Sequence, residues 1–119
     1  MASELRVTTI ANNAGTESVD STYVINGSAK AWVQLIGSGT VSTLDSFNSS
    51  SISDLAVGRY QTNFSNSMNN DDYAVTTADT FQTSGYYGST TSSHNIFCNG
   101  AVSTPVDSTV SAIVYGDLA

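Results

Sequence analysis

The chain has 119 residues, of which 39% are hydrophobic and only 11% are charged, and its formal net charge at pH 7 is −7. A single domain is expected at this length. Only three cations (Arg6, Lys30 and Arg59) oppose ten carboxylates. The composition therefore argues against nucleic acid and membranes as partners, because both surfaces attract clusters of positive charge. The acidity is expected to serve solubility.

Residues 1–25 are predicted to form an extended N-terminal arm. Polar and apolar residues alternate at 5–10, which is typical of a strand, and residues 19–25 are also expected to be extended. Between them, the small polar residues at 12–16 predict a turn. We expect the arm to dock on a larger particle through three apolar side chains: Leu5, Val7 and Ile10.

Residues 26–119 are predicted to form an all-β domain, an antiparallel β-sandwich or barrel. The domain begins at Asn26-Gly27, a pair that predicts a tight hairpin turn. A dense apolar run around Trp32, the only Trp, predicts a buried strand. Short alternating segments then follow, with turns between them and no helical periodicity. A long loop of small residues is expected at 85–93.

The order of short motifs carries a family resemblance. The motifs are AKAWV at 29–33, GSGTV at 37–41, DSFN at 45–48, SISD at 51–54 and GRYQTNF at 58–64. They resemble small tail-fibre-like virion structural proteins of marine bacteriophages, including cyanophages, and the two ends of the chain match that family's opening and closing motifs. The resemblance is loosest at 76–103. It implies a phage structural protein without catalytic residues.

The same resemblance implies a homotrimer, because fibre-type proteins usually trimerise. A strand-rich domain also has sheet edges to protect, and cyclic symmetry can close them. We expect the subunit contacts to use the apolar run, through Trp32, Leu35 and Ile36.

Two neighbouring aromatic residues, Tyr86 and Tyr87, lie in the predicted loop of small residues. Loop-borne Tyr gives rigid contact area for recognition, so both are candidates for contact with a glycan or protein on the host surface. The alternative is that one ring packs on a neighbouring sheet or subunit.

No residue pattern predicts catalysis, a metal or a cofactor. The acidic residues at 69–72 lack the ligand spacing of a calcium loop and are interpreted as a solvated turn. The single His94 is expected on a surface loop rather than at a metal site on a three-fold axis. Cys98, between apolar neighbours and far from any cation in sequence, is predicted to be a buried thiol and not a nucleophile. We therefore expect no enzymatic activity.

These observations predict a tail-fibre or appendage protein of a bacteriophage virion, attached to other virion proteins by its arm and presenting the β-domain to a host receptor. One alternative is a capsid decoration protein, such as a head fibre or knob. Another is a free carbohydrate-binding module, which would need no arm and would be monomeric. The first six residues lack the apolar core of a signal peptide, so we expect assembly in the host cytoplasm and localisation in the virion.

Overall fold

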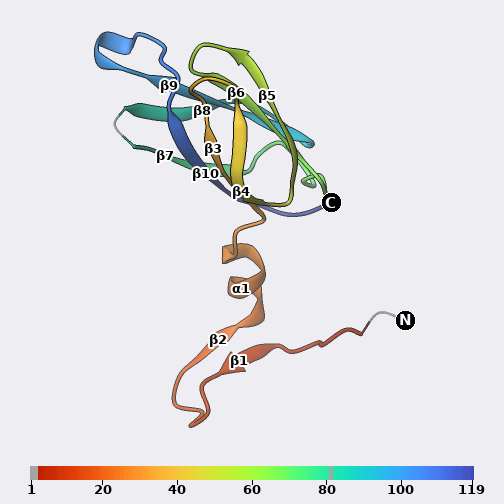
Figure 1. Ribbon diagram of the computed structural model, residues 1–119. Coiled ribbons are helices and arrows are strands. Elements are labelled where there is room, and N and C mark those ends of the chain that lie inside the picture. Colours follow the sequence, from red (N-terminus) through yellow and green to blue (C-terminus); the bar gives the residue numbers. More distant parts are fainter. Residues whose placement is uncertain (1–2, 81) are drawn as a thin grey trace.

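Ten strands, one α-helix and one short 3-10 helix form within residues 3–80 and 82–119, the part of the chain that the computed structural model describes (Figure 1). In chain order these are β1 (Thr9–Ala11), β2 (Ser18–Asp20), α1 (Ser21–Gly27), β3 (Ala31–Ile36), β4 (Ser42–Phe47), β5 (Ser49–Ala56), β6 (Arg59–Phe64), β7 (Ala74–Asp79), β8 (Thr83–Thr90), β9 (Ser93–Asn99), η1 (Ala101–Ser103) and β10 (Thr109–Tyr115).

Strands β3 to β10 form two antiparallel sheets of four strands each, which pack face to face. The strand order is β4-β3-β10-β7 in one sheet and β5-β6-β9-β8 in the other. The chain passes between the sheets from β4 to β5, from β6 to β7, from β7 to β8 and from β9 to β10. The prediction of an all-β antiparallel sandwich is therefore confirmed.

The core lies between the sheets and follows from the two-residue period of each strand. On β3, Ala31, Val33 and Leu35 point inward and are buried, and the residues between them point outward. They pack with inward residues of the other strands in two clusters. One cluster contains Val33, Leu35, Tyr60, Ile96, Cys98, Val110 and Ala112, and the other contains Ala31, Phe64, Met68, Tyr73 and Val114. The predicted buried strand around Trp32 is thus confirmed.

Asn48 forms the corner at which the chain leaves one sheet for the other. Its φ of 53° is a left-handed conformation that Asn tolerates better than most residues. The Asn48 amide nitrogen donates hydrogen bonds to the carbonyl oxygens of Lys30 (3.1 Å) and Asn66 (3.0 Å), and its oxygen accepts one from the Asn66 backbone N–H (2.7 Å). One side chain therefore joins three separate segments at this corner.

At the other end of the sandwich, Tyr60 fastens the segment before β10. Its hydroxyl donates to Asp107 Oδ1 (3.2 Å) and accepts from the Ser108 backbone N–H (3.3 Å). Burial raises the pKa of Tyr60 above its usual value, so the hydroxyl stays protonated. Gly37 is needed here because a Cβ at this position would overlap the Tyr60 hydroxyl and lie 2.7 Å from the Ser108 carbonyl oxygen.

The structure corrects three predictions near the N-terminus. Residues 21–27 form helix α1 and are not extended, because Asp20 caps the helix by accepting a hydrogen bond from the Thr22 backbone N–H (2.8 Å). Asn26 and Gly27 are the last residues of that helix and not a hairpin turn. The expected strand at 5–10 is limited to Thr9–Ala11, which pairs with β2.

The prediction of a long loop of small residues at 85–93 is also wrong, because residues 83–90 form strand β8. The small side chains have a structural reason. Gly85 lies opposite Phe97 on β9, and a Cβ at Gly85 would lie 2.6 Å from Phe97 Cε1. The strand therefore accommodates the large ring of its neighbour by omitting its own side chain.

Candidate functional site

The N-terminal segment, defined here as residues 3–28, has no buried residue. It lies outside the two sheets (Figure 1). Its apolar side chains are nevertheless large, and the most exposed are Leu5 (86%), Tyr23 (74%) and Ile25 (61%). Val7, Ile10, Val19 and Val24 are exposed as well. Contiguous apolar patches on a soluble protein mark places where another molecule binds.

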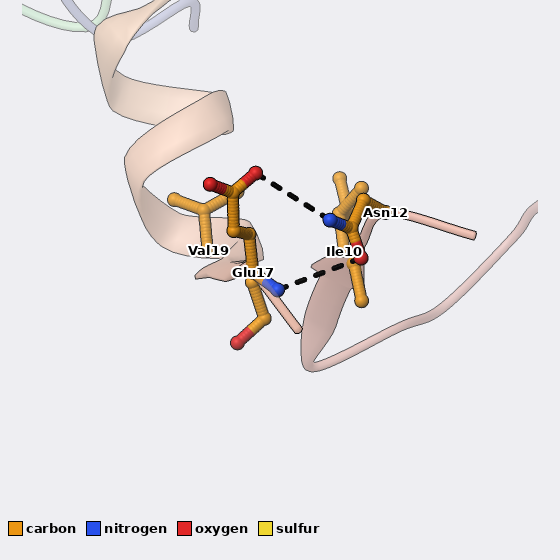
Figure 2. Close-up of a pocket in the computed structure, with 6 residues that line it drawn as sticks. Ile10, Asn12, Glu17 and Val19 are labelled. Atoms are coloured by element: carbon orange, nitrogen blue, oxygen red, sulfur yellow. Dashed lines mark hydrogen bonds between the residues drawn. The ribbon is translucent and has the colours of Figure 1, made fainter. Parts of the chain in front are cut away.

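A short hairpin gives this segment a defined shape. Strands β1 and β2 pair so that Ile10 lies opposite Val19. Asn12 closes the turn, since its amide oxygen accepts from the Thr16 backbone N–H (3.1 Å) and its nitrogen donates to Glu17 Oε2 (3.4 Å). Figure 2 shows Asn12 facing Glu17 across the hairpin, next to Ile10 and Val19.

A groove of about 440 Å³ lies between residues 4–10 and helix α1. Leu5, Val7 and Ile10, the three predicted docking residues, line it together with Val24 and Ile25 of the helix. The structure thus brings the three residues together and adds two that the sequence analysis missed. Amphipathic spacing could not reveal them, because a helix of seven residues contains barely two turns.

The expected subunit contact at Trp32, Leu35 and Ile36 is divided between two faces of β3. Leu35 is fully buried in the core, so the prediction that its side chain reaches another subunit is wrong. Trp32 lies on the outer face, opposite Phe47 of β4 and Ile113 of β10. Phe47 is 54% exposed and Ile113 is 36% exposed. Trp32 therefore belongs to an apolar row across the outside of the sheet, and Ile36 lies on the same face.

Tyr86 and Tyr87 do not form one contact surface. They are successive residues of β8, so their side chains leave opposite faces of the sheet. Tyr86 lies opposite the buried Ile96, and Tyr87 lies opposite Asn95 on the outer face. The Tyr87 ring is 6.4 Å from the Phe97 ring between centroids, and the Arg59 guanidinium lies 5.9 Å from the Tyr87 centroid. Tyr87 alone joins a cluster on the outer face.

His94 is buried in the core and not on a surface loop as predicted. It lies opposite Thr62 on β6, and its ring centroid is 5.4 Å from that of Phe64. Neither ring nitrogen has a hydrogen-bond partner among the described residues. Burial lowers the pKa of His94 to about 4, so the ring is neutral at pH 7. A neutral, enclosed imidazole of this kind belongs to the packing of the sandwich.

Cys98 is a buried thiol, as predicted. Burial raises its pKa to about 12, and a protonated thiol is a poor nucleophile. The residues that the structure describes include no group of three or more His, Cys, Asp or Glu side chains arranged to hold a metal ion. At 69–72, Asn70 Oδ1 accepts a hydrogen bond from the Asp72 backbone N–H (2.9 Å), which is a local turn contact.

Comparisons with protein-family models, with curated proteins and with solved structures find no match for this chain. Within the described ranges, no helix has the length and apolar character needed to cross a membrane. Function is therefore argued from the two kinds of surface just described: the apolar N-terminal segment and the outer faces of the sandwich.

Proposed function

We propose that this chain is a structural protein of a bacteriophage particle, of the tail-fibre or appendage type, which attaches through its N-terminal segment and presents its sandwich outward. The observation that carries the proposal is the contrast in burial between the two parts. The sandwich buries its own core. Residues 3–28, in contrast, include no buried residue, and seven of their large apolar side chains are exposed.

Exposure of this kind is costly for a protein that works alone. Fully burying a side chain such as Leu5 or Ile25 contributes about 1.5–3 kcal/mol. A partner that covers the groove between residues 4–7 and helix α1 would gain this contribution from several side chains at once. A monomeric carbohydrate-binding module would have no use for such a segment, so the structure favours a subunit of an assembly over a free module.

The tail-fibre position and the trimer both come from the resemblance in the sequence motifs. The edge strands β7 and β8 do not leave this side of the sandwich open, because they contact each other across the sheets and Ser84 Oγ donates to Thr77 Oγ1 (3.1 Å). We therefore propose that trimer contacts use the N-terminal segment and the outer row around Trp32. Docking on a capsid as a decoration protein would use the same segment at a different place.

The test compares Ile25→Asn with Leu55→Asn. Both positions are exposed and apolar, but Ile25 lines the groove, whereas Leu55 lies on β5, in the sheet that does not contain Trp32. Sedimentation of the full chain at micromolar concentration should show an oligomer that Ile25→Asn dissociates and Leu55→Asn leaves intact. A wild-type chain that sediments as a 12.4 kDa monomer and binds no virion protein would overturn the proposal.

A further inference from the structure

The outer face of the β5-β6-β9-β8 sheet gathers amide and aromatic side chains around a single cation. We call it the amide face and define it by six residues: Arg59, Gln61, Tyr87, Asn95, Phe97 and Asn99. The strand pairing places Arg59 beside Phe97, and Asn95 between Gln61 and Tyr87. The alternate residues of β6 and β9 are buried, which fixes these side chains on the outside.

Contacts with its neighbours hold the Arg59 side chain in one orientation and leave some of its N–H donors unused. Its guanidinium carbon lies 5.4 Å from the Phe97 ring centroid and 5.9 Å from that of Tyr87. Nη1 donates to the Gly58 carbonyl (3.0 Å) and to Asn99 Oδ1 (3.3 Å). In the described part of the chain no carboxylate pairs with Arg59, and its Nε and Nη2 have no acceptor. An Arg offers five N–H donors, so several remain for a ligand.

The charge around Arg59 differs from that of the rest of the protein. The chain carries ten carboxylates and a net charge of −7. Strands β6, β8 and β9, which form most of the amide face, contain no Asp or Glu. Asp107 is bound to the two chain neighbours of Arg59, because its Oδ1 accepts hydrogen bonds from the Gly58 backbone N–H (2.8 Å) and from the Tyr60 hydroxyl (3.2 Å). An anionic ligand would be repelled by most of this protein and attracted here, where the planar guanidinium can bind a carboxylate through two parallel hydrogen bonds.

From this arrangement we propose that the amide face binds an acidic glycan, with Arg59 contacting a uronic-type sugar carboxylate. Gln61, Asn95 and Asn99 carry amides, each of which can donate and accept hydrogen bonds, and sugar hydroxyls do the same. The exposed Tyr87 ring offers an apolar surface with a polar tip. A single cation is too few for a nucleic acid or an anionic membrane, since both bind through many cations.

This inference deepens the proposed function by naming the class of receptor, and its biological role rests on that function. The experiment titrates the full chain with oligogalacturonate, and with a neutral malto-oligosaccharide of equal length, by calorimetry at low and at physiological salt. Wild type is expected to bind the acidic oligomer and not the neutral one. Arg59→Gln should weaken binding about tenfold or more, because it removes a charge-assisted pair.

Arg6→Gln is the matched control, since it removes the same charge from an exposed side chain already paired with Glu4 (3.0 Å). It should change oligogalacturonate affinity less than twofold. Tyr87→Ala tests the same face through an exposed ring, in case Arg59→Gln disturbs folding, and should weaken binding severalfold with an unchanged thermal unfolding midpoint.

Three results would overturn the inference: no binding of oligogalacturonate by wild type, equal binding of the neutral oligomer, or equal losses in Arg59→Gln and Arg6→Gln. None of them bears on the docking of the N-terminal segment, which is measured without glycan. The two proposals can therefore fail separately.

Discussion

The sandwich and the N-terminal segment place similar apolar residues in opposite environments. Leu35 on β3 is fully buried, whereas Leu5 is 86% exposed. Leu5 belongs to a segment in which polar and apolar residues alternate, and Leu35 belongs to the apolar run of β3. The difference is that β3 has a second sheet to pack against, and the hairpin of β1 and β2 has none.

This contrast shows that apolar residues in a strand-like segment predict an apolar face but not the partner that covers it. A sheet that is apolar on one face is stable only when a second layer covers that face. In the sandwich both layers come from one chain. In the N-terminal segment helix α1 provides only part of a layer, and the groove beside it stays open. In the proposed function, another molecule supplies the layer that covers this groove.

The sharpest test of the contrast replaces one Leu in each region. Leu35→Ala should lower the free energy of unfolding by about 2–5 kcal/mol, because it leaves a cavity in the core. Leu5→Ala should change the stability of the monomer by less than about 0.5 kcal/mol, as expected for an exposed site. Urea denaturation of dilute protein measures both. Equal losses would mean that the segment is part of the folded core.

A second difference appears with pH, because only the sandwich buries a histidine. Its folded pKa of about 4 is below the unfolded value of 6.5, so the unfolded chain binds the proton first as pH falls. Stability should therefore be complete above pH 6.5 and decline by about 3 kcal/mol between pH 6.5 and pH 4. Urea titrations across this range measure the decline.

The control for this effect is His94→Phe, which fills a similar space without a titrating group. Its stability should depend much less on pH between 6.5 and 4 than that of wild type. A variant as pH-sensitive as wild type would show that carboxylates, and not His94, govern the acid response.

A smaller loss of folding stability is expected at Gly37, where the sandwich has no room for one methyl group. Gly37→Ala places a Cβ against the Tyr60 hydroxyl and the Ser108 carbonyl, and such overpacking costs about 1–3 kcal/mol. Gly27→Ala is the matched control, since a Cβ at that position meets nothing within 4 Å. Thermal unfolding should separate the two variants, and equal midpoints would contradict this account of Gly37.

A small effect on stability is also expected from the largest deletion. Removal of residues 1–25 takes away no buried residue among the described residues 3–25, and it removes the hydrogen bonds from the Ser28 backbone N–H to the Val24 carbonyl and from Lys30 Nζ to the Ile25 carbonyl. The sandwich should still unfold cooperatively, within about 1 kcal/mol of the full chain, but should no longer assemble. Loss of the cooperative transition would place the segment in the core.

Sequence patterns predicted the sandwich well where apolar residues were dense, as in the run of β3 around Trp32. They failed where a strand is made of small residues. Strand β8 has no apolar period, and its position is set by the Phe97 ring over Gly85 and by pairing with β9. Contacts of that kind are absent from local sequence, so Tyr86 and Tyr87 were placed together in a loop.

The candidate surfaces were predictable only in part. Leu5, Val7 and Ile10 were found as an apolar set, but their neighbours Val24 and Ile25 depend on a helix that Asp20 caps. His94 could not be placed, because its neighbours Thr62 and Phe64 come from a strand 30 residues earlier. Arg59 appeared only as a charge, since its two aromatic neighbours lie on other strands.

The pairing of β3 with β10 has a consequence for synthesis of the chain. The first strand of the sandwich lies beside the last, from Ala31 opposite Val114 to Ile36 opposite Thr109. During translation, β3 must therefore wait for its central neighbour until residues 109–115 have left the ribosome, and domains generally fold as units. A product cut short before residue 109 would lack a central strand and could not close its core. The topology thus makes β10 a requirement for a closed core.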